Sequence, residues 1–263
     1  MEGKSMKGDE IKRLAGRKNI PIGTINKDYV LTVVLKQISD LPYSNKLIFK
    51  GGTCIKKVYF EDARFSVDLD FTCLESLSDK ILEDLKEKLG KQEVLDINFM
   101  ELRKEERGGD SARHGVKYKD VNGHPNSIKL DLNSGADVKR DPVMRKVLNP
   151  YYQEIPDFEV RALPLKEILA EKIRAVITRG APRDVYDIWY LLGKGVEVDM
   201  ELVDEKLGTL KKDNEFDWEM FRERMLSKQE NWNRDLRTLV PEAPKFEQVR
   251  SEMESMMLNQ LES

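Results

Sequence analysis

The sequence predicts an α+β fold in its first part and an α-helical second part, and three observations lead to this prediction. Short segments up to residue 134 alternate apolar with polar side chains, which is the period of a β-strand. Glycine and asparagine lie between these segments, where turns are expected. Beyond Pro150, apolar residues recur mostly at helical spacing to the end of the chain.

The elements of the first part follow from local signals. Thr24 is a suitable N-cap for a helix that Pro42 ends. A short strand is expected at residues 47–49, and Ser78 begins a second helix that stops at Gly90. The remaining predicted elements are strands at 94–103, 113–121 and 126–134, a tight turn at Asn122-Gly123 and a charged loop at 104–112.

The second part is predicted to be helical almost throughout. Pro164 begins a helix that ends near Arg179, and residues 180–182 (Gly-Ala-Pro) separate it from the next helix. The other predicted elements are a strand near 155–160, a helix at 183–192 and three helices within 200–261. We therefore expect two domains, residues 1–160 and residues 161–263.

The composition is that of a soluble globular protein, with 263 residues of which 40% are apolar and 35% charged. No run of about 18 apolar residues occurs, and the N-terminus lacks the apolar core of a signal peptide, so we expect a cytoplasmic protein with no membrane partner. The two cysteines and two histidines form no metal-binding motif, which argues against a disulfide framework or a structural zinc site.

Charge is distributed unevenly along the chain. Residues 1–60 contain 12 Lys and Arg against 5 Asp and Glu, whereas residues 197–263 contain 10 against 17. A basic end can attract phosphate groups or nucleic acid, although a solvated helical face is the commoner cause of such an excess.

Two aspartates share one face of a predicted strand. In RFSVDLDF, apolar residues alternate with Ser66, Asp68 and Asp70, so the two carboxylates point to the same side, roughly 7 Å apart. Like charges repel at this separation unless a cation lies between them, and Mg²⁺ with its oxygen ligands suits such a position. The alternative is a solvated strand face, which is the usual meaning of an isolated D-x-D.

The segment Lys50-Gly51-Gly52-Thr53 lies between the first strand and a following helix. Glycines there let the backbone approach a phosphate group, the helix start offers N–H groups, and threonine offers a hydroxyl. The alternative is that the glycines serve only the conformation of the turn. The segment is not a Walker A loop, because the G-x-x-x-x-G-K-[ST] frame is missing.

A third carboxylate, Asp131, lies with Lys129 and Asn133 on the polar face of the strand in SIKLDLNSG. A two-metal site needs several carboxylates on neighbouring strands, and Asp131 could complete one. The sequence does not reveal whether this strand neighbours the strand of Asp68.

One lysine lies on the apolar stripe of the helix that Pro164 begins. Lys172 falls between Leu169 and Val176 at helical spacing, so it needs either a path to water or a partner. An isolated lysine would extend its aliphatic stem until the ammonium reaches water. Alternatively, Asp184 and Asp187 of the next helix could meet it across a helical hairpin, as a structural ion pair or as part of a site. Arg183 could brace Asp187 or contact a phosphate.

The motifs FKGGT, RFSVDLDF, LKEILAEKIRA and RDVYDIWYLL, preceded by INKDYVLTVVLKQI, together resemble the AbiEii/AbiGii toxin family within the DNA-polymerase-β-like nucleotidyltransferases. The resemblance covers residues 10–195. It implies a nucleotidyltransferase-like N-terminal domain with a mixed β-sheet, and a helical domain that completes the site. It also implies the toxin half of a type IV toxin–antitoxin pair, which adds nucleotides from NTPs to RNA, with tRNA acceptor ends as one target class.

The resemblance assigns roles to individual residues. The implied metal ligands are Asp68, Asp70 and, less directly, Asp131. The implied nucleotide-binding residues are Lys50, Gly51, Gly52, Thr53, Arg64, Ser66 and Arg183. The implied catalytic residues are Asp68, Asp70, Lys172, Asp184 and Asp187. Thr53 stands where the superfamily usually has serine and keeps the hydroxyl.

We therefore expect a Mg²⁺-dependent nucleotidyltransferase that uses an NTP and an RNA acceptor and has an antitoxin partner. Phosphoryl-type transfer relies on positioning and charge neutralisation, so the scarcity of histidine is no obstacle. Two alternatives remain open: a non-catalytic nucleotide- or partner-binding module of the same fold, and nucleotidyl transfer to a protein or a small molecule.

Overall fold

The computed structural model describes residues 8–90, 95–108, 111–134, 138–151, 155–208 and 215–261. The chain divides into two compact units, which are described separately below. The core unit comprises residues 1–136 and 142–162, and the helical unit comprises residues 137–141 and 163–263. The short segment 137–141 thus belongs to the helical unit, although the chain returns to the core unit after it.

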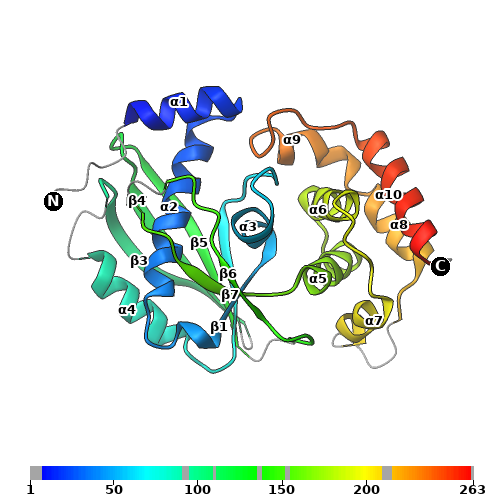
Figure 1. Ribbon diagram of the computed structural model, residues 1–263, viewed down its shortest axis with the longest axis horizontal. Helices are drawn as coiled ribbons and strands as arrows, with labels where there is room; N and C mark the ends of the chain where they lie inside the picture. The colour runs from blue at the N-terminus through cyan, green and yellow to red at the C-terminus, as the bar shows by residue number, and fades with distance from the viewer. Residues whose placement is uncertain are drawn as a thin grey trace. The chain divides into compact units, whose positions relative to one another are not determined.

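The core unit is built on a seven-stranded mixed sheet with the order β3-β4-β5-β2-β1-β7-β6 (Figure 1). Strand β2 pairs in parallel with β5 and antiparallel with β1, and β1 pairs in parallel with β7. The strands are β1 (Leu47–Lys50), β2 (Asp68–Cys73), β3 (Asn98–Gly108), β4 (Ser111–Lys119), β5 (Pro125–Ser134), β6 (Val143–Lys146) and β7 (Glu159–Ala162).

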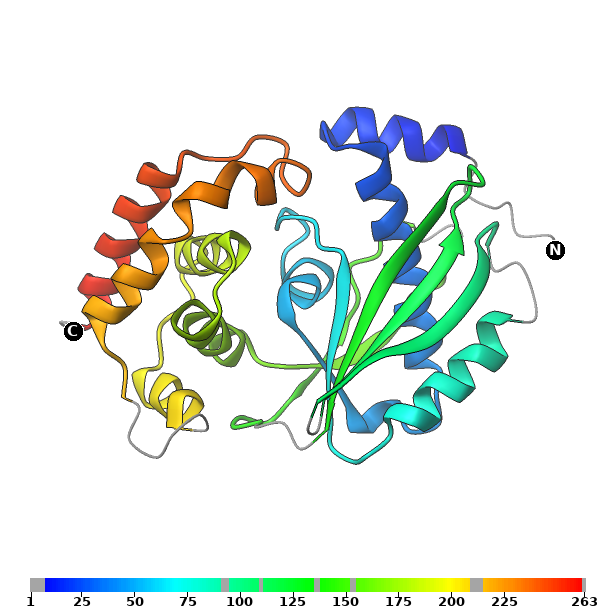
Figure 2. The same cartoon turned by 180° about the vertical axis from the view of Figure 1, so that it is seen from behind.

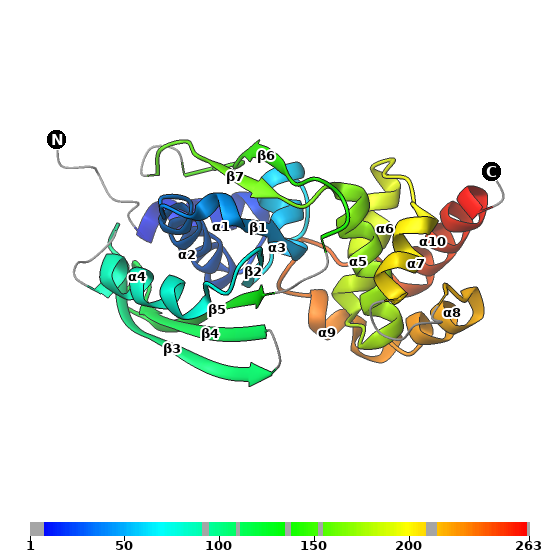
Figure 3. The ribbon, with the colours of Figure 1, turned by 90° about the horizontal axis from the view of Figure 1, so that it is seen from below.

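Helices cover one face of this sheet. The helical segments are α1 (Gly8–Lys18), α2 (Ile22–Ser39), η1 (Ser44–Lys46), α3 (Gly51–Cys54), η2 (Ile55–Tyr59) and α4 (Ser78–Gly90). Figure 3 shows α2 and α4 on the same side of strands β3, β4 and β5, and in Figure 2 these strands lie in front of α2. Leu130 and Leu132 of β5 are buried, whereas Lys129 is exposed and Asp131 is half-buried. The alternation of β5 therefore gives the sheet one apolar face and one charged face.

Three predictions for the core unit are wrong. The segment 104–112 is not a loop, because its described part belongs to the paired strands β3 and β4. Thr24 is not the N-cap, since α2 begins at Ile22 after Pro21 and Thr24 is buried inside the helix. Strand β6 was not predicted, because its four residues are mostly exposed and show no alternation of burial.

The helical unit is centred on α5 (Leu165–Thr178) and α6 (Pro182–Gly193), as the sequence predicts (Figure 1). Helices α7 and α8 pack against α5, and α9 and α10 pack against α6. Their bounds are α7 (Met200–Gly208), α8 (Trp218–Leu226), α9 (Trp232–Leu236) and α10 (Phe246–Leu261). The described residues after 200 thus form four α-helices instead of the predicted three; the five-residue α9 is too short to leave a periodic pattern.

A buried ion pair attaches segment 138–141 to the helical unit. Glu167 of α5 and Lys206 of α7 have no exposed side-chain surface and approach to 2.6 Å. The two carboxylate oxygens of Glu167 also accept the backbone N–H groups of Lys139 and Arg140, both at 2.8 Å. Because every strong acceptor of Glu167 is occupied, this contact is a structural connection.

Among the described residues, none of the helices has both the length and the apolar composition needed to cross a lipid bilayer.

Candidate functional site

The turn from β1 into α3 brings the Gly-Gly-Thr segment against the strand that carries the two aspartates. Gly51 has a φ of +77°, a conformation that residues with a Cβ rarely adopt. A Cβ on Gly51 would also collide with the carboxylate of Asp70. Two independent features therefore favour glycine at this position: its positive φ angle and the close approach of its backbone to Asp70.

The next two residues contact the segment that leads into β2. A Cβ on Gly52 would lie 2.6 Å from a guanidinium nitrogen of Arg64, so this side chain packs directly on the glycine. Arg64 is buried and donates to the carbonyl of Phe65 at 3.0 Å. The Thr53 hydroxyl donates to the backbone carbonyl of Asp68 and so fastens α3 to the first residue of β2. Ser66 lies buried in the extended stretch between them.

Asp68 and Asp70 lie on the same face of β2 and are both half-buried. The structure answers the question that the sequence left open, because β2 and β5 are neighbours and pair in register with Asp70 opposite Asp131. On the other side of β2, Asp70 lies opposite Lys50. Residues paired across adjacent strands project to the same face. The three carboxylates therefore share one face of two adjacent strands.

The Asp131 carboxylate is engaged by a neighbouring cation. Arg113 of β4 lies opposite Asp131 in the sheet and donates to both of its carboxylate oxygens, from Nε at 2.8 Å and from Nη2 at 3.0 Å. A planar guanidinium matches a carboxylate in this two-point arrangement. In this structure Asp131 is thus oriented toward the β4 side of the sheet.

The donor set of β2 fits Mg²⁺. Within the described ranges, no three Asp, Glu, His or Cys side chains are grouped so as to hold a metal by themselves. Mg²⁺, however, commonly takes one or two carboxylates and completes its coordination with water and substrate phosphates. Asp68 and Asp70, side by side with the backbone of Gly51, supply such a pair of hard oxygen donors.

The helical unit contains a second polar cluster, on the stripe that the sequence singled out. Lys172 is buried, and its ammonium lies 2.8 Å from Asp184 and 2.7 Å from Asp187. The prediction that these residues meet between α5 and α6 is confirmed, and the alternative in which Lys172 alone extends to water is wrong. In the Lys172 cluster (Lys172, Asp184 and Asp187) two carboxylates therefore share a single ammonium, and the charge of Arg179 also acts on Asp184.

Local sequence explains how Asp184 reaches this position. Pro182 begins α6, and Asp184 lies in its first turn, where one carboxylate oxygen accepts the N–H of Ala181 at 3.1 Å and the other accepts Lys172. Burial by itself would raise the pKa of Asp184, but the charge of Lys172 and these hydrogen bonds lower it to about 2. Arg183, the preceding residue, is half-buried.

Three charged residues near the aspartates were not among the predicted site residues. They are Arg113, which holds Asp131, and two lysines that lie near Asp68, Lys27 of α2 and Lys129 of β5. Only the position of Lys129 two residues before Asp131 was visible in the sequence. The other two depend on strand register and on helix packing, which a single sequence does not contain.

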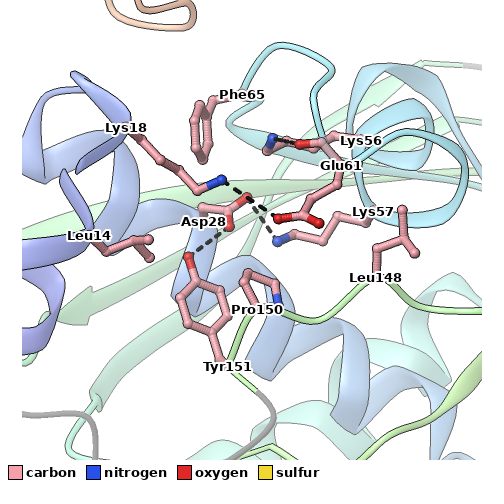
Figure 4. Close-up of a pocket in the computed structure, with 10 residues that line it drawn as sticks. All are labelled: Leu14, Lys18, Asp28, Lys56, Lys57, Glu61, Phe65, Leu148, Pro150 and Tyr151. Atoms are coloured by element: carbon pink, nitrogen blue, oxygen red, sulfur yellow. Dashed lines mark hydrogen bonds and ion pairs between the residues drawn. The ribbon is translucent and has the colours of Figure 1, made fainter. Parts of the chain in front are cut away.

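A further pocket of the core unit, about 320 Å³ and open to solvent, contains a buried ionic cluster (Figure 4). Lys57 of η2 lies 2.8 Å from Asp28 of α2, and Tyr151 donates to the same carboxylate at 2.7 Å. Burial lowers the pKa of Lys57 against the opposing effect of Asp28, and it raises the pKa of Tyr151. Because α3 continues directly into η2, this cluster braces the helix that begins with Gly51.

One family model and several solved structures match this chain. A family model described as "Nucleotidyl transferase AbiEii toxin, Type IV TA system" matches residues 33–252. This range includes the Gly-Gly-Thr segment, both aspartates of β2 and the Lys172 cluster. No curated protein matches the chain significantly.

Two solved structures share the fold. MenT4, the nucleotidyltransferase toxin Rv2826c from Mycobacterium tuberculosis, superposes with a TM-score of 0.75 at 17% identity, covering 98% of this chain and 90% of that chain. JHP933 from Helicobacter pylori has a TM-score of 0.63 at 18% identity, covering 92% and 94%. At such identities the likeness concerns the fold.

Proposed function

Because the chain belongs to the AbiEii family of nucleotidyltransferase toxins from type IV toxin–antitoxin systems, we propose that it transfers nucleotides from an NTP to RNA in a Mg²⁺-dependent reaction. The observation that carries this proposal is the packing of Gly51 on Asp70, with Asp68 on the same strand face. A phosphate-binding turn and two hard-metal ligands thus adjoin each other in the core unit. We further propose tRNA acceptor ends as the RNA, a cognate antitoxin as partner, and the cytoplasm as the place of action.

Each part of the core site has a task in this reaction. The backbone at Gly51, Gly52 and Thr53 holds the triphosphate, with Lys50 and Arg64 supplying positive charge. Asp68 and Asp70 would hold Mg²⁺, with Asp131, which pairs with Arg113 here, as a further candidate ligand. The metal ion, when bound, supplies charge neutralisation on the phosphates and a lower pKa for a coordinated hydroxyl.

The transfer itself breaks a phosphoanhydride bond of the NTP and forms a phosphodiester bond to the acceptor. The acceptor hydroxyl oxygen forms a bond to the α-phosphorus of the NTP, the bond from that phosphorus to the pyrophosphate oxygen breaks, and pyrophosphate leaves with the bonding electrons. The hydroxyl proton passes to a carboxylate oxygen of Asp68 or Asp70 and then to water. We propose that Lys172, Asp184, Asp187 and Arg183 of the helical unit take part in the same reaction, by contacting the nucleotide.

Incubation with labelled NTPs, Mg²⁺ and total RNA tests the proposal. We expect labelled RNA from the wild-type protein, and a loss of at least about a hundredfold in Asp68→Asn, in Asp70→Asn and in the double variant. Asp157→Asn is the matched control, because Asp157 is an exposed aspartate of the core unit that pairs with the exposed Lys146. Labelling that persists in the double variant contradicts the assignment.

The alternatives are distinguished in the same experiment. NTP binding measured by calorimetry without any labelled product would indicate a non-catalytic module. A label that mass spectrometry finds on a protein or on a small molecule would keep the enzyme and replace the acceptor.

A further inference from the structure

Two lysines lie beside Asp68 without forming an ion pair. Lys129 of β5 lies directly opposite Asp68 in the register of the two parallel strands, and it is exposed. Lys27, in the second turn of α2, is half-buried; burial lowers its pKa, Asp68 raises it and Lys129 lowers it. The charges of Asp68 and Lys129 thus both act on Lys27. Within the described part of the chain, neither lysine forms an ion pair or a hydrogen bond with a side chain.

The position of Lys129 in the sheet separates it from the Gly-Gly-Thr segment. In the strand order β5-β2-β1, Asp68 and Asp70 occupy the middle strand, the segment Gly51–Thr53 follows β1 on one side, and Lys129 lies on β5 on the other. The cations near the two aspartates are thus divided, with Lys50 opposite Asp70 on β1 and Lys129 opposite Asp68 on β5.

The placement of cations on both sides of the two aspartates matches the geometry of in-line transfer. The attacking oxygen and the leaving pyrophosphate lie on opposite sides of the α-phosphorus. If the triphosphate occupies the Gly51–Thr53 side of the aspartates, then the acceptor approaches from the β5 side, where Lys129 and Lys27 lie. A nucleic-acid acceptor brings phosphodiester groups next to its reacting hydroxyl, and unpaired lysine ammonium groups bind such groups as point charges.

We propose that Lys27 and Lys129 form a phosphate subsite that holds the backbone of the acceptor RNA beside Asp68. This inference rests on the proposed function, because it requires that the acceptor is a polynucleotide. The subsite recognises phosphodiester charge and not base sequence, since neither lysine offers a planar two-point hydrogen-bonding pattern.

Salt-dependent RNA binding tests the subsite without any reaction. A fluorescently labelled single-stranded oligoribonucleotide is titrated with protein over a series of salt concentrations, in the absence of NTP. Each lysine that contacts a phosphate contributes about 0.7 to the slope of log affinity against log salt. We expect Lys27→Met and Lys129→Met to lower the slope by about that amount each, and the double variant to lower it by about twice as much.

Matched variants separate the subsite from general charge effects. Lys86→Met and Lys88→Met remove two exposed lysines of α4 and should leave the slope unchanged. Lys27→Arg and Lys129→Arg keep the positive charge and should therefore keep the wild-type slope of log affinity against log salt. Affinity for a non-hydrolysable NTP, measured by calorimetry, should stay at the wild-type value in all of them.

Three results would overturn the inference. The double variant could keep the wild-type slope of log RNA affinity against log salt, while the wild-type protein binds and extends RNA. This result would remove the subsite and leave the proposed function intact. A loss of NTP affinity with unchanged RNA binding would assign the two lysines to the triphosphate. A wild-type protein that extends only a non-RNA acceptor would remove both the proposed RNA function and the subsite.

Discussion

Helix α5 carries one residue of each of two buried lysine–carboxylate clusters, and they differ in what surrounds the charges. In the Glu167–Lys206 pair, both side chains have 0% exposure and both carboxylate oxygens also accept backbone N–H groups. In the Lys172 cluster, the Lys172 side chain keeps 11% exposure and two carboxylates share its ammonium.

The difference indicates distinct roles for the two clusters. The Glu167–Lys206 pair has its strong donors and acceptors satisfied by protein, so it holds segment 138–141 on the helical unit; Glu171 approaches Lys206 less closely, at 3.5 Å. The Lys172 side chain, by contrast, keeps some exposure to solvent. A buried charged group with a shifted pKa, as at Asp184, and access to solvent is a candidate for a functional site.

The largest expected effect follows from breaking the saturated pair. Lys206→Met leaves the Glu167 carboxylate buried without its counter-ion and should lower the free energy of unfolding by about 3–5 kcal/mol. Urea unfolding measures this loss. Lys166→Met is the control on the same helix, because the Lys166–Glu197 pair is exposed and such pairs contribute only about 0–1 kcal/mol. If the two variants were equally stable, Glu167 would not depend on Lys206 and the structural role would be wrong.

The second effect concerns activity at Lys172. Lys172→Arg keeps the positive charge between Asp184 and Asp187 but replaces a compact ammonium with a larger planar group. We expect nucleotidyl transfer to fall by about 10²–10³-fold, the range found when a single preorganised donor is lost. The loss in unfolding free energy should be much smaller than in Lys206→Met.

Lys206→Arg is the matched comparison for Lys172→Arg. Its specific activity per folded molecule should equal that of the wild-type protein, as judged by the NTP-labelling assay after correction for the folded fraction. Equal activity losses in both arginine variants would show that the two clusters do not differ in function.

The third and smallest effect is a pH dependence of stability that arises at Asp184 of the Lys172 cluster. The pKa of Asp184 is lowered from 3.8 to about 2 in the folded protein, so the folded state favours the ionised carboxylate. This contribution is complete above pH 3.8 and is lost as the pH falls toward 2; it amounts to about 2 kcal/mol.

The measurement is the unfolding free energy of wild-type protein and Asp184→Asn across this pH range. The variant has no carboxylate at position 184 to protonate, so its stability should decline less steeply with acid. Parallel declines in the two proteins would show that the Lys172 cluster does not hold Asp184 ionised.

Much of the candidate site was predictable, because its motifs carry local signals. The alternation in RFSVDLDF placed both aspartates on one face, and the helical period placed Lys172 on an apolar stripe. The consequences of pairing were not predictable. The described part of the segment 104–112, predicted to be a loop, belongs to two strands. Charged residues have a low intrinsic preference for strands, but pairing with a neighbouring strand can override that preference.

The sequence by itself determined the fold class, the two glycines at the turn from β1 into α3, and the order of acidic and basic motifs, because each depends on neighbours a few residues away. Only the tertiary structure decided that Asp131 lies opposite Asp70 but is held by Arg113, and that Lys27 and Lys129 lie beside Asp68. Strand register and helix packing are set by burial summed over the whole core unit, and the pairing of β2 with β5 brings together residues about sixty positions apart.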